Sequence, residues 1–136
     1  MVVMTHIQKQ QLLKKAVAAM QRAYAPYSRF CVGAALLTRE GRVFQGCNVE
    51  NASYGLTLCA ERTALGAAVA AGHRRFTAIA IVSSGQIAPI PCGACLQALA
   101  EFCRPDFVIL TAAARDPAAT VAYTLKDLLP RAFRLG

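Results

Sequence analysis

The sequence predicts an α/β protein in which helices and strands form a sandwich around one mixed sheet. Two observations support this fold class. Segments with helical periodicity alternate with strand-like segments along the chain. The chain also shows no repeat, low-complexity tract or linker, and 136 residues is an ordinary size for one domain. We therefore expect residues 1–136 to form a single domain.

The first half of the chain predicts a helix followed by a β-hairpin. Apolar residues recur at helical spacing over residues 7–24, and Pro26 ends this pattern. Residues 30–38 are apolar on both alternating faces, which is typical of a strand inside a sheet that is covered on both sides. Gly41 suits a tight turn that leads into a returning strand over residues 43–48.

The second half of the chain alternates helices with strands. The expected elements are, in order, a helix over residues 58–71, a strand over 76–83, a helix over 92–102, strands over 107–111 and 120–123, and a final helical turn over 124–129. Gly72 stops the first of these helices, Pro91 precedes the second, and Thr124 caps the last turn.

Three cysteines have the spacing of metal ligands. Cys59 begins one predicted helix, and Cys92 and Cys95 lie three residues apart at the start of the next, so their side chains share one side of a helical turn. Each helix follows a strand and a loop, which brings the sulfurs together at the end of the sheet. Three protein ligands leave a fourth position for water, as in catalytic zinc sites. We predict one Zn²⁺ per subunit, held by these cysteines.

Two charged residues follow the first ligand. Glu61 is placed to shuttle protons beside the metal. Burial would raise its pKa, whereas the helix N-terminus and Arg62 would lower it, so the net direction stays open. Alone, such a glutamate would more often only complement the helix dipole. Arg62 is predicted to offset the charge of three thiolates by donating hydrogen bonds to a ligand sulfur; the alternative is a surface residue or an ordinary ion-pair partner.

Composition narrows the class of partner. The net charge is +8, but the basic residues are scattered and do not interleave with aromatic residues, so nucleic acid is not an expected partner. No apolar run approaches the roughly 20 residues of a membrane helix, and no secretory signal opens the chain, so we expect a cytoplasmic protein without a membrane partner.

Clustered cysteines in a reducing compartment are more often metal ligands than disulfides. Cys31, Cys47 and Cys103 are expected to be small buried residues.

The apolar fraction predicts an oligomer. It reaches 56% with only 16% charged residues, and a chain of this size buries a limited share of its surface. We therefore expect further apolar surface to be buried between subunits. The alternative is that the many alanines inflate the count.

Beyond these residues, the chain resembles the small, homotetrameric cytidine deaminases whose zinc ligands are all cysteines. The matching segments are residues 23–28, 30–37, 46–52, 59–65, 91–95 and 128–130, together with Phe133. The resemblance covers nearly the whole chain. It implies a three-layer α-β-α sandwich with a mixed five-stranded sheet. It also implies hydrolytic deamination of cytidine and 2′-deoxycytidine to the uridines plus ammonia, in pyrimidine salvage.

The resemblance also implies the residues that bind the nucleoside. They are Asn48 and Glu50 for the sugar, Phe30 as the aromatic that packs on the nucleoside, the backbone of Ala60 for the base, and Tyr54 and Phe133 to complete pockets across subunits. Phe30 and Phe133 could instead serve simple packing, and Tyr27 could belong to the pocket wall or to the core.

One residue departs from the family pattern. Many members have an arginine directly after the last cysteine, where this chain has Leu96. We hypothesise that Arg62 alone offsets the thiolate charge here, unless another group compensates.

Three alternatives to this interpretation stay open. A blasticidin-type deaminase would keep the metal motif, but Phe30 and the Asn48-x-Glu50 pair favour an ordinary nucleoside. A zinc-stabilised protein that binds nucleic acid through its charge would not need Glu61. A redox pair formed by Cys92 and Cys95 would contain a disulfide and no metal.

Overall fold

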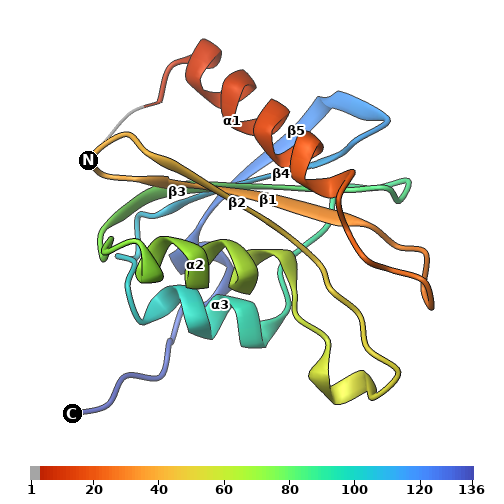
Figure 1. Cartoon of the computed structure of the whole chain (residues 1–136). Coiled ribbons are helices and arrows are strands. Elements are labelled where there is room, and N and C mark those ends of the chain that lie inside the picture. Colours follow the sequence, from red (N-terminus) through yellow and green to blue (C-terminus); the bar gives the residue numbers. More distant parts are fainter. Residues whose placement is uncertain (1–3) are drawn as a thin grey trace.

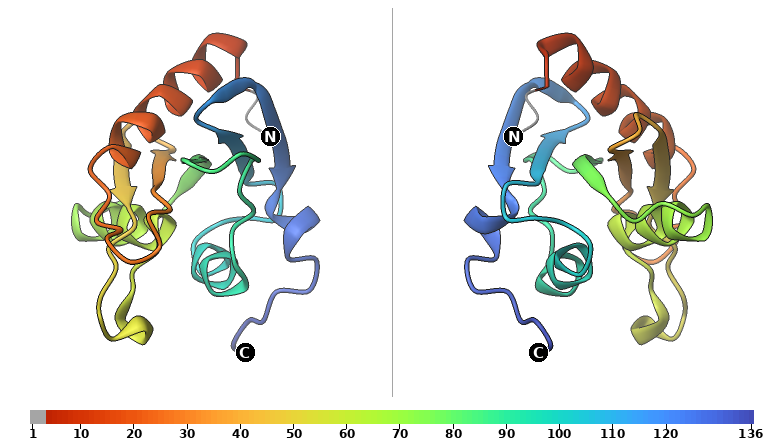
Figure 2. Two further views of the ribbon diagram at one scale, coloured as in Figure 1. Left: turned by 90° about the vertical axis from the view of Figure 1, so that its right-hand side faces the viewer. Right: turned by 90° about the vertical axis from the view of Figure 1, so that its left-hand side faces the viewer.

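The computed structural model describes residues 4–136 and has three layers (Figure 1). The elements are α1 (His6–Met20), β1 (Val32–Thr38), β2 (Val43–Cys47), the short helix η1 (Tyr54–Leu56), α2 (Ala60–Ala70), β3 (Phe76–Ser83), α3 (Gly93–Ala100), β4 (Val108–Ala113), β5 (Asp116–Thr124) and α4 (Leu125–Leu128). Helix α1 covers one face of the sheet, and α2 and α3 cover the other (Figure 2).

The sheet is mixed and five-stranded, as predicted. Its order is β2-β1-β3-β4-β5. Strand β1 is antiparallel to both β2 and β3, β3 is parallel to β4, and β4 is antiparallel to β5. The parallel pair sends the chain from β3 through α3 into β4, which places the start of α3 near the end of β3.

Two element boundaries differ from the prediction by four residues, and the others differ by at most two. Helix α1 ends at Met20 rather than at residue 24, because the backbone N–H of Tyr24 donates to the carbonyl of Asn48 at 3.0 Å instead of continuing the helix. Strand β5 begins at Asp116, four residues before the predicted start. It is an edge strand, where Pro117 is tolerated because no further strand needs its missing N–H.

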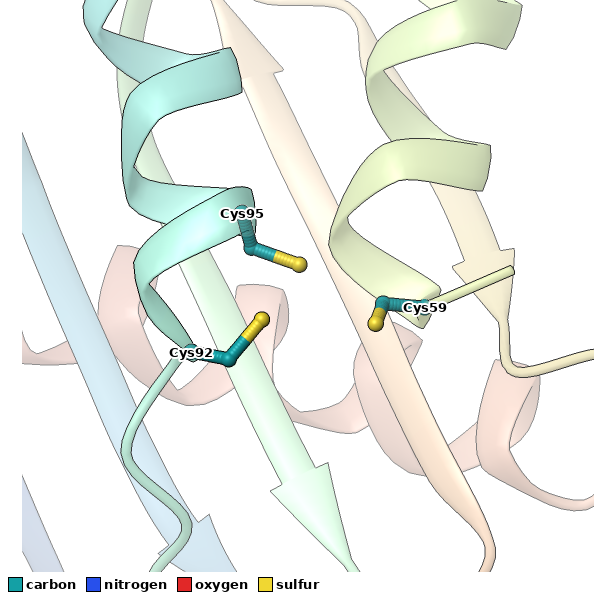
Figure 3. A group of neighbouring side chains, drawn as sticks. All are labelled: Cys59, Cys92 and Cys95. Carbon is teal, nitrogen blue, oxygen red and sulfur yellow. The ribbon is translucent and has the colours of Figure 1, made fainter. Parts of the chain in front are cut away.

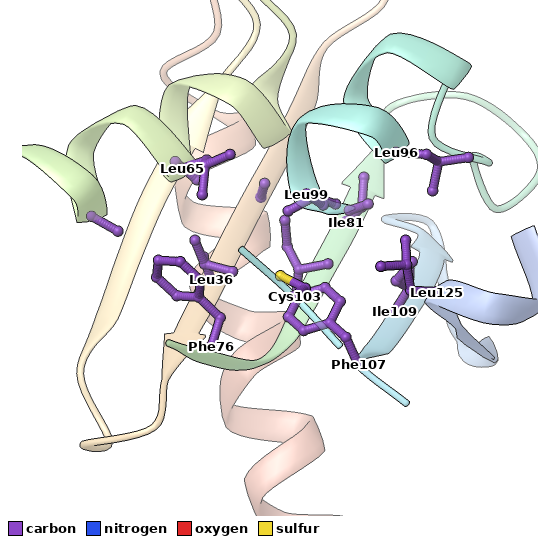
Figure 4. Packing of buried hydrophobic residues seen from close by; sticks show 14 of the residues in the cluster. Leu36, Leu65, Phe76, Ile81, Leu96, Leu99, Cys103, Phe107, Ile109 and Leu125 are labelled. Atoms are coloured by element: carbon purple, nitrogen blue, oxygen red, sulfur yellow. The ribbon is translucent and has the colours of Figure 1, made fainter. Parts of the chain in front are cut away.

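The core consists of two apolar layers, one on each face of the sheet. The larger layer lies under α2 and α3 (Figure 4) and contains Leu36, Ile81 and Leu99, each at most 1% exposed. On the other face α1 lies so close to β1 that a Cβ on Gly33 would come within 2.8 Å of Met20 Cα. Glycine is required at this position by packing rather than by backbone conformation.

The cysteines outside the predicted metal site differ in burial. Cys103 is buried, and burial raises the pKa of its thiol to about 12, so it is an inert apolar residue. Cys31 and Cys47 are only partly buried, so the prediction of full burial was wrong for these two. Cys31 directly precedes β1 and Cys47 is the last residue of β2, so both lie at strand ends. Within residues 4–136, no helix has the length and apolar character needed to cross a membrane.

Candidate metal centre and active site

The three predicted ligands converge at the starts of two helices. Cys59 is the residue before α2, Cys92 is the residue before α3, and Cys95 lies in the first turn of α3. Their Sγ atoms all lie within 4.8 Å of one another, pointing into the same space (Figure 3). A tetrahedral zinc with Zn–S bonds of about 2.3 Å needs sulfurs roughly 3.8 Å apart, so Zn²⁺ fits with only a small contraction.

The first turns of α2 and α3 favour negative charge at the sulfurs. The pKa of Cys92 is lowered: burial raises it, but hydrogen bonds from the backbone N–H groups of Cys95 and Ala94 and from neighbouring thiols lower it by more. The pKa of Cys95 is raised, first by burial and then by the negative charge of Glu61. A bound cation opposes that effect, because zinc binds thiolates and releases their protons.

Glu61 lies in the first turn of α2 and is 6% exposed. Burial raises the pKa of its carboxyl group, and this effect exceeds the lowering by its own backbone N–H, by Cys95 and by the charge of Arg62. This result settles the direction that the sequence left open. A carboxylate with a raised pKa is a stronger base than an exposed one, which suits proton transfer near neutral pH.

Arg62 contacts the metal centre directly. Its Nη2 donates to Cys59 Sγ at 3.4 Å, and this bond is the main reason why the pKa of its guanidinium is raised. Among residues 4–136, no group pairs with its buried Nε atom. Leu96 is 5% exposed and packs in the core layer with Leu99, so at this position the chain uses a core residue rather than a charge.

Asn48 holds the start of β1. Its Nδ2 donates to the Phe30 carbonyl at 2.7 Å, and its Oδ1 accepts from the Val32 N–H at 2.9 Å. The side chain therefore fixes the backbone on both sides of Cys31 and sets the position of Phe30. The Phe30 ring is 43% exposed and lies so close to Gly85 that a Cβ there would be 2.8 Å from Phe30 Cε1.

Glu50 holds the loop before β1. Its carboxylate accepts from the N–H groups of Tyr27 and Ser28 at 3.0 and 3.1 Å and from the Ser28 hydroxyl. The hydroxyl of Ser28 is the main cause of the lowered pKa of Glu50. Arg29, which follows Ser28 in the chain, has a φ of 58°, a left-handed conformation that non-glycine residues seldom adopt. The bonds from Glu50 help to hold this strained loop in place.

A cavity of about 310 Å³ lies beside Glu50. Its lining residues are Tyr27, Ser28, Glu50, Tyr54 and Thr57. The rings of Tyr27 and Tyr54 meet edge to face with centroids 6.1 Å apart. Thr57 precedes Cys59 by two residues, so the cavity adjoins the segment that carries the first ligand.

The structure brings the predicted site residues together in separate groups, with the three sulfurs in one group and Glu50 and Tyr54 in another. Tyr54 joins Glu50 at the cavity but is 75% exposed. Phe133 is 68% exposed and lies outside that lining, with its carbonyl accepting from Gln97 of α3 at 2.9 Å. Ala60, directly after Cys59, is completely buried, backbone included. Sequence reasoning missed Ser28, because no local pattern pairs it with a carboxylate 22 residues away.

A three-layer α/β sandwich that presents three cysteine sulfurs beside a buried glutamate has the fold and site of a zinc-dependent deaminase domain. The family model for the cytidine and deoxycytidylate deaminase zinc-binding region matches residues 6–111. The chain belongs to this family, and its metal is Zn²⁺. The family match and the convergence of Cys59 with Cys92 and Cys95 favour a zinc site over the redox alternative.

Similar proteins match the chain over most of its length. It is 48% identical over 125 residues to a cytidine deaminase of Halalkalibacterium halodurans, a match that covers 92% of this chain and 93% of that protein. A crystal structure of cytidine deaminase from Burkholderia pseudomallei is 49% identical, with a TM-score of 0.87 over 96% of this chain and all of that one. The Mycobacterium tuberculosis enzyme is 44% identical with a TM-score of 0.79, covering 93% and 98% of the two chains.

Proposed function

We propose that the protein catalyses the hydrolytic deamination of cytidine and 2′-deoxycytidine to uridine and 2′-deoxyuridine with release of ammonia, as a step of pyrimidine salvage. The observation that carries this proposal is the buried Glu61 beside three converging sulfurs. Similarity to proteins named cytidine deaminase supports the choice of substrate. A purely structural zinc site would need no buried carboxylate with a raised pKa.

Within this reaction the chain supplies the proton transfers. Zn²⁺, when bound by the three thiolates, supplies a Lewis acid that activates water for attack on C4 of the base. Glu61 accepts one proton from the attacking water and delivers it to the ring nitrogen. It then accepts the second proton, from the hydroxyl now bonded to C4, and delivers it to the leaving amine. Its raised pKa suits both halves of this cycle. Arg62 holds Cys59 and balances part of the thiolate charge.

The proposed nucleoside contacts are compatible with the bonds these side chains already make. The Glu50 carboxylate offers about four lone-pair sites and uses three of them on the Tyr27 and Ser28 groups, which leaves one for a sugar hydroxyl. Asn48 keeps one N–H donor and one lone pair beyond its two backbone bonds. The half-exposed Phe30 side chain offers an apolar face for the nucleoside. The contact between the Ala60 backbone and the base stays a prediction from the position of Ala60 directly after Cys59.

We further propose that the active form is a homotetramer in which neighbouring subunits complete each pocket. Several large apolar side chains around the site are exposed in a single chain, namely Tyr54, Leu56, Leu58, Ile90 and Phe133. An apolar surface of this kind marks an interface, and subunit contacts would cover it. Light scattering that reports a monomer at micromolar concentration, with full activity, would contradict this part. The cytoplasmic location and the absence of a nucleic-acid partner stay predictions.

The proposal is tested by mixing zinc-loaded protein with cytidine and following the fall in absorbance. Glu61→Gln should retain zinc yet lose turnover by about 10²- to 10⁴-fold, the usual contribution of general acid–base catalysis. The matched control is Glu101→Gln, which removes an exposed carboxylate at the end of α3 and should leave turnover unchanged. Wild-type turnover in Glu61→Gln, or salt-dependent binding of single strands without any turnover, would overturn the proposal.

A further inference from the structure

The first turn of α2 lies in direct contact with the backbone of β2. Gly46 is buried in β2, and a Cβ at this position would lie less than 3.0 Å from the Ala60 carbonyl, the Ala64 nitrogen and the Thr63 hydroxyl. Two of these atoms belong to the helix backbone, which cannot swing aside as a flexible side chain can. Any side chain at residue 46 would therefore push this turn of α2 away from the sheet.

Thr63 ties the same turn to the same strand. Its Oγ1 donates toward the carbonyl of Cys47 in β2 and toward the carbonyl of Ala60 in α2, each at 2.9 Å. The hydroxyl thus bridges the two elements next to Gly46. Neither Thr63 nor Gly46 has a part in the metal chemistry or in the proton transfers described above.

The turn held by this contact carries half of the active site. Cys59 precedes it, and Glu61 and Arg62 lie within it, whereas Cys92 precedes α3 and Cys95 lies in the first turn of α3. Helix α2 contacts β2 far more extensively than it contacts α3. The distance between the Cys59 sulfur and the other two sulfurs is consequently set through the sheet, and the contact at β2 is where α2 is anchored.

We propose that Gly46 and Thr63 are positioning residues for the metal centre. Gly46 fixes how closely the first turn of α2 approaches the sheet, and Thr63 fixes where the turn sits along β2. Together they place Cys59 within reach of the metal held by Cys92 and Cys95, and they place Glu61 beside the reacting atoms. The inference rests on the proposed deaminase function only for its kinetic readout.

The chain offers a matched control for a purely structural effect. Gly33 makes an even closer approach on the opposite face of the sheet, where a Cβ would lie 2.0 Å from the Ala16 carbonyl oxygen and 2.4 Å from the Met20 nitrogen of α1. Gly33→Ala should therefore lower the melting temperature as Gly46→Ala does, but it displaces α1 rather than α2. Any difference between the two variants at the metal centre reports positioning and not general destabilisation.

The experiment compares Gly46→Ala, Gly33→Ala, Thr63→Val and Thr63→Ser below their melting temperatures. Zinc release to a coloured chelator, the visible spectrum of the Co²⁺-substituted protein, and kcat with KM are measured for each. Gly46→Ala should release zinc faster and lose kcat on the order of 100-fold, the effect of a displacement near 1 Å at a reacting centre. Thr63→Val should lose about 10- to 100-fold in metal retention, with Thr63→Ser near wild type, since the hydroxyl is kept.

Zinc release and a Co²⁺ spectrum identical to wild type in Gly46→Ala would overturn the proposal, as would equal impairment in Thr63→Ser and Thr63→Val. A Gly33→Ala variant as impaired at the metal as Gly46→Ala would also overturn it. If Gly46→Ala does not fold, the two Thr63 variants decide the matter. If the wild-type protein does not deaminate cytidine, the proposed function fails, but the zinc and Co²⁺ measurements still test the positioning role.

Discussion

Replacing Arg62 by glutamine tests how this chain balances the charge of three thiolates. The substitution keeps an N–H donor, on a shorter side chain, but removes the positive charge whose Nη2 lies 3.4 Å from Cys59 Sγ. Because Leu96 occupies the core, no arginine directly after the last cysteine shares the task in this chain. We therefore expect Arg62→Gln to weaken zinc binding without unfolding the protein.

The size of the effect follows from the strength of a charged hydrogen bond. A bond to an ionised group contributes about 1.5–3 kcal/mol, and roughly 1.4 kcal/mol corresponds to a tenfold change in an equilibrium constant. Arg62→Gln should accordingly weaken zinc affinity about 10- to 100-fold, which agrees with the usual effect of outer partners of metal ligands. The Arg62 side chain is only half-buried, and solvent screening places the expected value toward the lower end of this range.

The assay is competition for zinc between the protein and a coloured chelator, with turnover of cytidine measured at saturating zinc. Arg104→Gln is the control, because the Arg104 side chain is 80% exposed and lies 4.0 Å from its partner Asp106. It should bind zinc as wild type does. Arg62→Gln with wild-type affinity and turnover would refute the idea that this guanidinium supports the metal centre.

Three further predictions concern the pocket, the core and a helix cap. Glu50→Gln should raise KM more than it lowers kcat, because it weakens both the loop at Ser28 and the contact with the sugar; equal loss in both would argue against a role in binding. Leu99→Ala, at a completely buried site, should lower the free energy of unfolding by about 2–5 kcal/mol in urea titrations. The backbone N–H of Thr124 donates to the Asp127 carboxylate and lowers its pKa. This carboxylate therefore stabilises the fold above its ordinary pKa, and the stabilisation is lost as the pH falls below about 4. Asp127→Asn should accordingly show a smaller drop in melting temperature between neutral and acidic pH than the wild type.

The features that sequence reasoning predicted are those that local patterns control. The pattern of apolar residues located every α-helix and strand that the structure describes, although not the short helix η1. The spacing of Cys92 and Cys95 within one turn placed both sulfurs on the same side of α3. Cys59 could be assigned to the same metal site because its context matches that of Cys92. At both positions a strand and a loop precede the cysteine, and a helix follows it.

The features that were missed depend on pairs distant in sequence. Tyr24 leaves α1 because it bonds to Asn48, and Ser28 matters because Glu50 reaches it. The direction of the pKa shift of Glu61 depended on its depth beneath the surface, which no count of neighbouring charges can provide. In the sequence, Gly46 is only one residue of a predicted strand, and its role becomes evident from the contact that α2 makes with it.

One proposed sugar contact, Glu50, and the first metal ligand, Cys59, lie on one continuous segment, and backbone bonds hold this segment in place. Val49 and Leu58 exchange two backbone hydrogen bonds of 2.9 Å, which close the loop between β2 and α2 at its base. Glu50 lies just inside this closure and Cys59 just outside it. A sugar held at Glu50 and a metal held at Cys59 are therefore separated by a fixed pair of backbone bonds rather than by a flexible loop. This rigidity is what a site needs if binding of the sugar is to place the base beside Glu61 for reaction.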